Sequence, residues 1–105
     1  MADKTGGFDG SPVPWERRDG FVYDSEGEVI CFSYGYESDD DLIAAAPELL
    51  EALRELIQTH EYSLRIGYER IIELGGDCDS PEIMINKDSS LNKAKVAIAK
   101  ALGKQ

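Results

Sequence analysis

The chain has 105 residues, of which 42% are hydrophobic and 30% are charged, and this fits one small domain with a modest core. It carries 21 acidic and 11 basic residues, a net charge of −10, and it has no apolar run long enough to span a membrane. Because so negative a field repels nucleic acid and anionic lipid, we expect neither direct nucleic-acid binding nor membrane association, and a basic surface is the favoured partner.

The charge is unevenly placed. All 21 acids and seven of the bases precede Ser89, a net charge of −14, whereas the segment from Ser89 to Gln105 holds four lysines and no acid. The N-terminal residues lack the apolar stretch of a signal peptide, and two cysteines, Cys31 and Cys78, are too few for a disulfide framework. We therefore expect the protein to stay in the compartment where it is made, the cytoplasm, with two free, partly buried thiols.

Residues 1–14 hold five glycines and prolines and are predicted to form a flexible arm, with a single domain over residues 15–105.

A β-hairpin is predicted at about 20–34. Two runs of β-branched and aromatic residues, 21–23 and 29–32, flank the segment 24–28, whose Asp and Gly are typical of a short hairpin loop.

The helical part is predicted to begin at Ser38, where a row of aspartates favours a helix N-terminus. Pro47 follows a short apolar run and disfavours a helical residue before it. The sequence therefore predicts a short helix, a bend, and a second helix that starts at Pro47.

A long central helix is predicted at about 47–74, where Gly75 and Gly76 end it. Apolar residues recur at alternating steps of three and four, which is typical of a dimerising coiled coil. One continuous helix is favoured, and a break near 59–63 that would give an antiparallel pair stays open. The seam that could join two copies contains Leu50, Leu53, Ile57, His60, Leu64 and Ile71.

A C-terminal helix is predicted at about 91–102, capped by Ser89 or Ser90 and stopped by Gly103. A short turn before it begins at Ser80 and Pro81. Together these elements predict an α+β fold in which the N-terminal hairpin packs on three to four helices.

Several acids on the helical part are spaced so that they could share a face. Such a row is either a solvated helix face or a contact surface for a basic partner, and the pattern leaves both interpretations open. The candidate contacts are Asp39, Asp40, Asp41, Glu48, Glu51 and Glu55.

No catalytic arrangement stands out. His60 is the one histidine and has no companion at metal-ligand spacing, and the acidic loop 77–82 lacks the glycine and distant glutamate of a calcium-binding loop. No phosphate-binding loop or dinucleotide fingerprint is present. We expect no cofactor, no metal and no enzymatic activity. A metal-dependent hydrolase using the loop 77–82 is the least favoured hypothesis.

The segment 41–53, which reads DLIAAAPELLEAL, resembles one that recurs in small bacteriophage and prophage proteins. In those proteins a strand pair with a G-E-V/I turn precedes the segment, and a final helix similar to residues 94–103 ends the chain. The family pattern has A-N-A-R before the leucine, whereas this chain has residues 38–41, SDDD. Most such proteins have no assigned function, so the resemblance implies a phage origin and transfers no catalytic residue. Small acidic phage proteins include inhibitors of host defence, among them DNA mimics and anti-CRISPR proteins.

The leading hypothesis is therefore a phage-encoded acidic protein that occupies a basic surface of a host defence or nucleic-acid-processing complex. The alternative is a structural accessory protein that assembles as a homodimer through the long helix.

Overall fold

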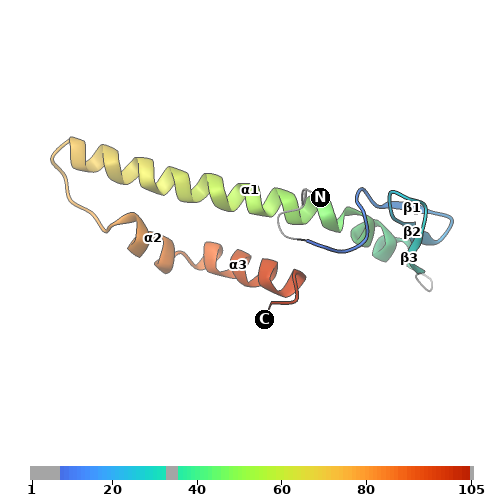
Figure 1. The fold of residues 1–105 in the computed structure, drawn as a ribbon. Helices are drawn as coiled ribbons and strands as arrows, with labels where there is room; N and C mark the ends of the chain where they lie inside the picture. The colour runs from blue at the N-terminus through green and yellow to red at the C-terminus, as the bar shows by residue number, and fades with distance from the viewer. Residues whose placement is uncertain (1–7, 33–35, 105) are drawn as a thin grey trace. The chain divides into compact units, whose positions relative to one another are not determined.

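The computed structural model describes residues 8–32 and 36–104. Its elements are β1 (Glu16–Arg18), β2 (Phe21–Tyr23), β3 (Val29–Phe32), α1 (Glu37–Glu73), α2 (Pro81–Lys87) and α3 (Ser89–Ala101) (Figure 1). A three-stranded antiparallel sheet followed by helices, the first of them long, confirms the predicted α+β class. The chain divides into two compact units, Met1–Ala52 and Leu53–Gln105. Residues 1–7 of the predicted arm and 33–34 of the predicted hairpin lie outside the described part.

The first unit contains a sheet with the strand order β1-β2-β3, one strand more than the predicted hairpin. Arg18 pairs with Phe21, so Asp19 and Gly20 form a two-residue turn between β1 and β2. Both residues have positive φ angles, 54° and 83°, as a type I′ turn requires. An Asp-Gly pair is a strong hairpin signal, and it explains why the short segment before β2 joins the sheet.

The turn between β2 and β3 has the predicted chemistry. Asp24 Oδ1 accepts hydrogen bonds from the backbone nitrogens of Glu26 and Glu28, both at 2.9 Å. Gly27 has a φ of 84°, the left-handed conformation that glycine adopts without strain. These contacts fix the length of the loop and therefore the pairing of the two strands.

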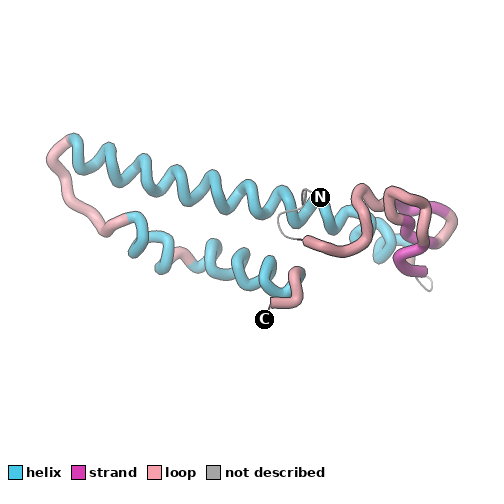
Figure 2. Tube along the Cα trace, in the orientation of Figure 1, coloured by secondary structure: helices cyan, strands magenta, loops and turns pink. Residues whose placement is uncertain are grey.

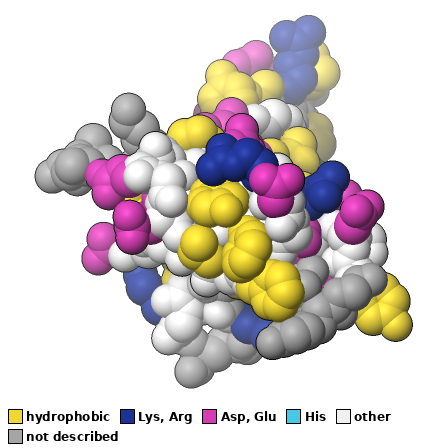
Figure 3. All heavy atoms as spheres, turned by 90° about the vertical axis from the view of Figure 1, so that its right-hand side faces the viewer, with side chains coloured by type: hydrophobic (Ala, Val, Ile, Leu, Met, Phe, Trp, Pro, Cys, Tyr) yellow, Lys and Arg dark blue, Asp and Glu magenta, His cyan; other side chains and the backbone are white. Residues whose placement is uncertain are grey.

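The sheet has two different faces. Val22 is fully buried on one face, and its partner in β3 on that face is Cys31. On the other face Phe21 stacks against Phe32 at 4.8 Å between ring centroids, and Arg18 lies 4.3 Å from the centroid of Tyr23. Figure 3, viewed from the side on which Figure 1 draws the strands, shows hydrophobic side chains gathered beside acidic and basic ones.

The segment before β1 packs on itself. The Phe8 ring meets the Trp15 indole edge-on at 5.7 Å, and Trp15 Nε1 donates a hydrogen bond to the Ser11 carbonyl at 3.1 Å. The Ser25 amide donates to the Pro12 carbonyl at 3.1 Å, which joins this segment to the β2–β3 turn. Residues 8–14 of the predicted arm thus make specific contacts that hold Trp15 in place.

Helix α1 begins at Glu37, so the prediction of a bend and a new helix at Pro47 is wrong. Three alanines, the residues of highest helix propensity, precede Pro47, and acids in the first turn favour the positive end of the helix. A proline inside a helix costs about 3 kcal/mol. Pro47 is buried, and the burial of its ring acts in the opposite direction. The helix also continues through residues 59–63, as the favoured prediction had it.

The second unit contains the later part of α1 together with α2 and α3, and Figure 2 shows it as mostly helix. Its buried apolar side chains in the described residues are Ile85, Leu91 and Ile98. Helix α1 ends as predicted: Gly76 N donates to Ile71 O and Gly75 N to Ile72 O, the pattern of a Schellman motif. Gly103 ends α3 in the same way, with a φ of 70°.

Candidate partner-binding surface

The predicted acidic contacts all lie on α1, but the structure exposes them unequally. Asp39 and Asp41 are exposed, whereas Asp40 between them is 1% exposed, and its Oδ1 has no hydrogen-bond partner among the described residues. Glu48, Glu51 and Glu55 are exposed. A helix turns by about 100° per residue, which is why adjacent acids of one turn differ so much in exposure.

Three of these acids fall at intervals of seven residues, namely Asp41, Glu48 and Glu55. Seven residues make almost two helical turns, so the three side chains follow one face of α1 with a rise of about 10 Å between neighbours. Within the described part of the chain, neither Glu48, Glu51 nor Glu55 forms an ion pair. This stretch of helix therefore carries negative charge that the chain itself leaves uncompensated.

Asp41 has a different environment, because its Oδ1 lies 2.6 Å from Arg17 Nε of β1. This ion pair joins the first strand to the first turns of α1. An open groove of about 520 Å³ lies beside it, lined by Trp15, Glu16, Arg17, Asp41, Ala44, Ala45 and Glu48. Sequence reasoning missed this groove, since no spacing pattern indicates that Trp15 comes next to a helix that begins more than twenty residues later.

The apolar seam predicted for dimerisation is partly in use within the second unit. Ile57 lines a pocket of about 210 Å³ together with Arg54, Gln58, Lys95 and Ile98, so this side of α1 faces α3. Leu50, Leu53 and Leu64 are half-buried, and Ile71 is exposed. Dimerisation through this seam stays a prediction.

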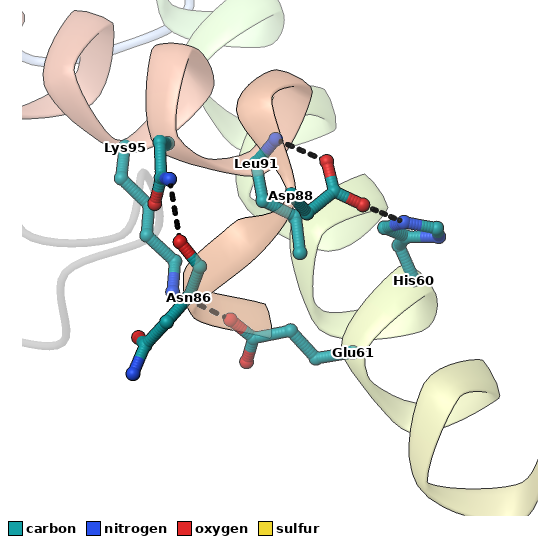
Figure 4. Close-up of polar contacts among 7 residues, drawn as sticks. His60, Glu61, Asn86, Asp88, Leu91 and Lys95 are labelled. Carbon is teal, nitrogen blue, oxygen red and sulfur yellow. Dashed lines mark hydrogen bonds and ion pairs between the residues drawn. The ribbon is translucent and has the colours of Figure 1, made fainter. Parts of the chain in front are cut away.

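His60, a member of that seam, contacts the junction between α2 and α3 (Figure 4). Its Nε2 donates to Asp88 Oδ2 at 2.8 Å, and Asp88 Oδ1 accepts the Leu91 amide at 2.9 Å. The Oε2 atom of the next residue, Glu61, lies 2.7 Å from Lys95 Nζ of α3. Figure 4 shows the His60 and Glu61 side chains pointing toward these partners on the segment from α2 to α3.

Asp88 is the N-cap of α3, so the prediction of Ser89 or Ser90 as the cap is wrong. All three residue types can cap a helix. An ionised aspartate also interacts favourably with the helix dipole, and here its second oxygen accepts the bond from His60. The Leu91 amide, followed by the His60 side chain, lowers the pKa of Asp88 below its ordinary value.

This lowered pKa predicts a loss of stability in acid. A carboxyl group whose pKa is depressed in the folded state stabilises the fold above its unfolded pKa, near 3.8, and that contribution disappears as the pH falls through the folded value. We expect the stability of Asp88→Asn to depend less on pH below about 4 than that of the unmodified protein. Urea unfolding at pH 7 and pH 3 measures it. Asp77→Asn, which changes an exposed loop acid, is the control. If both variants reduce the difference in unfolding free energy between pH 7 and pH 3 by the same amount, the prediction is contradicted.

The cysteines and the possible metal-binding and membrane-spanning segments remain to be placed. Cys31 and Cys78 are free and half-buried. Among the residues described, no group of three or more His, Cys, Asp or Glu side chains is placed to hold a metal ion, and no helix is both long and apolar enough to cross a membrane.

A comparison with family models matches residues 3–105 to the family described as Salmonella phage P22 protein Y8K6. No curated protein and no solved structure matches the chain.

Proposed function

The chain belongs to the family of Salmonella phage P22 protein Y8K6, as its resemblance to small phage proteins led us to expect, and on this premise we propose that it acts by binding a protein with a basic surface. The partner is a host defence or nucleic-acid-processing complex, and the chain inhibits or modulates it as a DNA mimic or an anti-CRISPR type of protein does. The protein is not an enzyme, and it works in the cytoplasm of the bacterial host.

The observation that carries this proposal is the acidic face of α1, on which most carboxylates form no ion pair within the described residues. We define this acidic face as Asp41, Glu48, Glu51 and Glu55, all of which are exposed. Asp39 is also exposed, but it lies two residues before Asp41 and therefore on the opposite side of the helix. Lysine and arginine side chains that contact phosphate also bind carboxylates well, so a row of carboxylates can occupy a surface built for nucleic acid. The net charge of −10 accelerates the encounter with such a surface.

Asp40 is left out of the acidic face because it is 1% exposed. The four lysines after Ser89 lie on the second unit, where Lys95 pairs with Glu61. The structure thus places basic and acidic groups next to each other at α3, whereas Glu48 and Glu51 have no basic neighbour in an ion pair within the described residues.

The test compares two triple charge reversals as baits in a nuclease-treated host lysate. One carries Glu48→Lys, Glu51→Lys and Glu55→Lys; the control carries Glu69→Lys, Glu73→Lys and Glu82→Lys, which changes the net charge equally at other exposed positions. We expect the unmodified protein and the control to retain a basic protein in stoichiometric amount that high salt removes, and the first variant to lose it. Retention by both variants, or loss from both, would overturn the assignment of the acidic face.

A further inference from the structure

The residues that line the groove beside β1 suit one particular kind of side chain. One wall comes from residues 15–17 and the other from α1, through Asp41, Ala44, Ala45 and Glu48. Three carboxylates and one guanidinium line it, so the lining carries a net charge of −2. Its volume of about 520 Å³ is large enough to admit a whole side chain of a partner.

Three of the four charges that line the groove are already paired. Arg17 and Asp41 bind each other at 2.6 Å, and Glu16 pairs with Arg18 at 2.7 Å. Glu48 is the lining carboxylate without an ion pair in the part of the chain described. A cation entering the groove therefore meets Glu48 without first breaking an internal bond.

The indole of Trp15 gives the groove a second feature that selects for a cation. The hydrogen bond from its Nε1 to Ser11 and the edge-on contact with Phe8 hold the ring in one orientation. A held aromatic ring binds a flat guanidinium by stacking without a further loss of side-chain freedom. Ala44 and Ala45, with their small side chains, leave space along the helix for the aliphatic stem of such a residue.

We propose that this groove binds an arginine side chain of the basic partner, with the guanidinium on the Trp15 indole and its charge against Glu48. The inference rests on the proposed function, because it names the residue type through which the acidic face holds its partner. Arginine fits better than lysine, since its planar group both stacks on an aromatic ring and donates two hydrogen bonds to a carboxylate.

Trp15 is the one tryptophan in the sequence, so its fluorescence reports on the groove itself. The experiment titrates the full chain with tetra-arginine, tetra-lysine and tetra-serine peptides and follows the emission. We expect a saturable change with tetra-arginine, a weaker one with tetra-lysine and none with tetra-serine. Glu48→Gln should weaken tetra-arginine binding about fivefold, the size expected for one charge-assisted contact. The control Glu82→Gln removes an exposed acid of the other unit and should leave binding within about twofold.

Two results would contradict binding of arginine in the groove and indicate diffuse charge attraction. One is an emission change that does not saturate with tetra-arginine, and the other is an equal loss of tetra-arginine affinity in Glu48→Gln and Glu82→Gln. Circular dichroism of each variant confirms that the helices persist. The proposed function is tested separately. If the charge reversal at Glu48, Glu51 and Glu55 removes the captured partner but Trp15 emission does not respond to tetra-arginine, the partner binds at the acidic face without an arginine in the groove.

Discussion

Replacing Leu91 by alanine is expected to lower the free energy of unfolding by about 2–4 kcal/mol. Leu91 is 4% exposed and belongs to the small set of buried apolar side chains in the second unit, with Ile85 and Ile98. The substitution removes three carbon atoms and leaves a cavity that the neighbouring side chains fill only in part. A domain of this size is stable by only about 5–15 kcal/mol, so the loss is a large share of the total.

Leu56→Ala is the matched control for this prediction. Leu56 is also a leucine within a helix, but it is 66% exposed, so its removal is expected to change stability by less than about 1 kcal/mol. Urea unfolding followed by circular dichroism compares the two variants. If both lose the same stability, Leu91 is not buried as described, and the packing of the second unit is wrong.

In the first unit, Val22→Ala is expected to cost about 2 kcal/mol. Val22 is 0% exposed and is the one large apolar side chain classed as buried in the described part of that unit's sheet. The substitution removes buried apolar area from the face of the sheet that Val22 shares with its register partners, Arg17 and Cys31.

The control here is Val29→Ala on the neighbouring strand. Val29 is 55% exposed, so this variant makes the same change in strand propensity and removes little buried area. Trp15 fluorescence during urea unfolding reports on the first unit, because this residue directly precedes β1. If the urea concentration at the midpoint of unfolding shifts equally in both variants, Val22 is not a core residue.

The parts of the fold that rest on local chemistry could be predicted from the sequence. The Asp24 loop and the glycines after α1 and α3 act through neighbouring residues, and each forms as expected. The strand β1 was missed because it is only three residues long, all charged, and its evidence lies in the Asp19-Gly20 turn. The proline rule failed at Pro47 because it describes an isolated helix, whereas this proline is buried.

The candidate site could be predicted only in part. Helical spacing places Asp41, Glu48 and Glu55 on one face whatever the tertiary structure. Which of three adjacent aspartates is buried depends on tertiary packing, and the sequence does not distinguish Asp40 from its neighbours. The Trp15 groove needs the pairing of Arg17 with Asp41, a contact between residues far apart in the sequence. The hydrogen bond between His60 and Asp88 could not be predicted, since the two residues are 28 positions apart in the sequence.

The unpaired carboxylates of the acidic face connect the structure to the proposed function. In the second unit Glu61 and Lys87 have partners of opposite charge within 3.1 Å, whereas Glu69, Glu73 and Glu82 form no ion pair among the described residues. On the acidic face only Asp41 has one among the described residues. Carboxylates that remain unpaired on a rigid helix are well placed for a basic partner, because they bind it without breaking internal contacts.

Site-specific photocrosslinking tests the central claim, binding of a basic protein at the acidic face, most directly. A photoreactive residue replaces Ala52, which is exposed between Glu51 and Glu55, or Ala97, an exposed position on α3, and irradiation follows in host lysate. We predict that position 52 gives an adduct with one basic protein, that high salt before irradiation prevents it, and that position 97 gives none. No adduct from position 52, or the same adducts from both positions, would contradict the account.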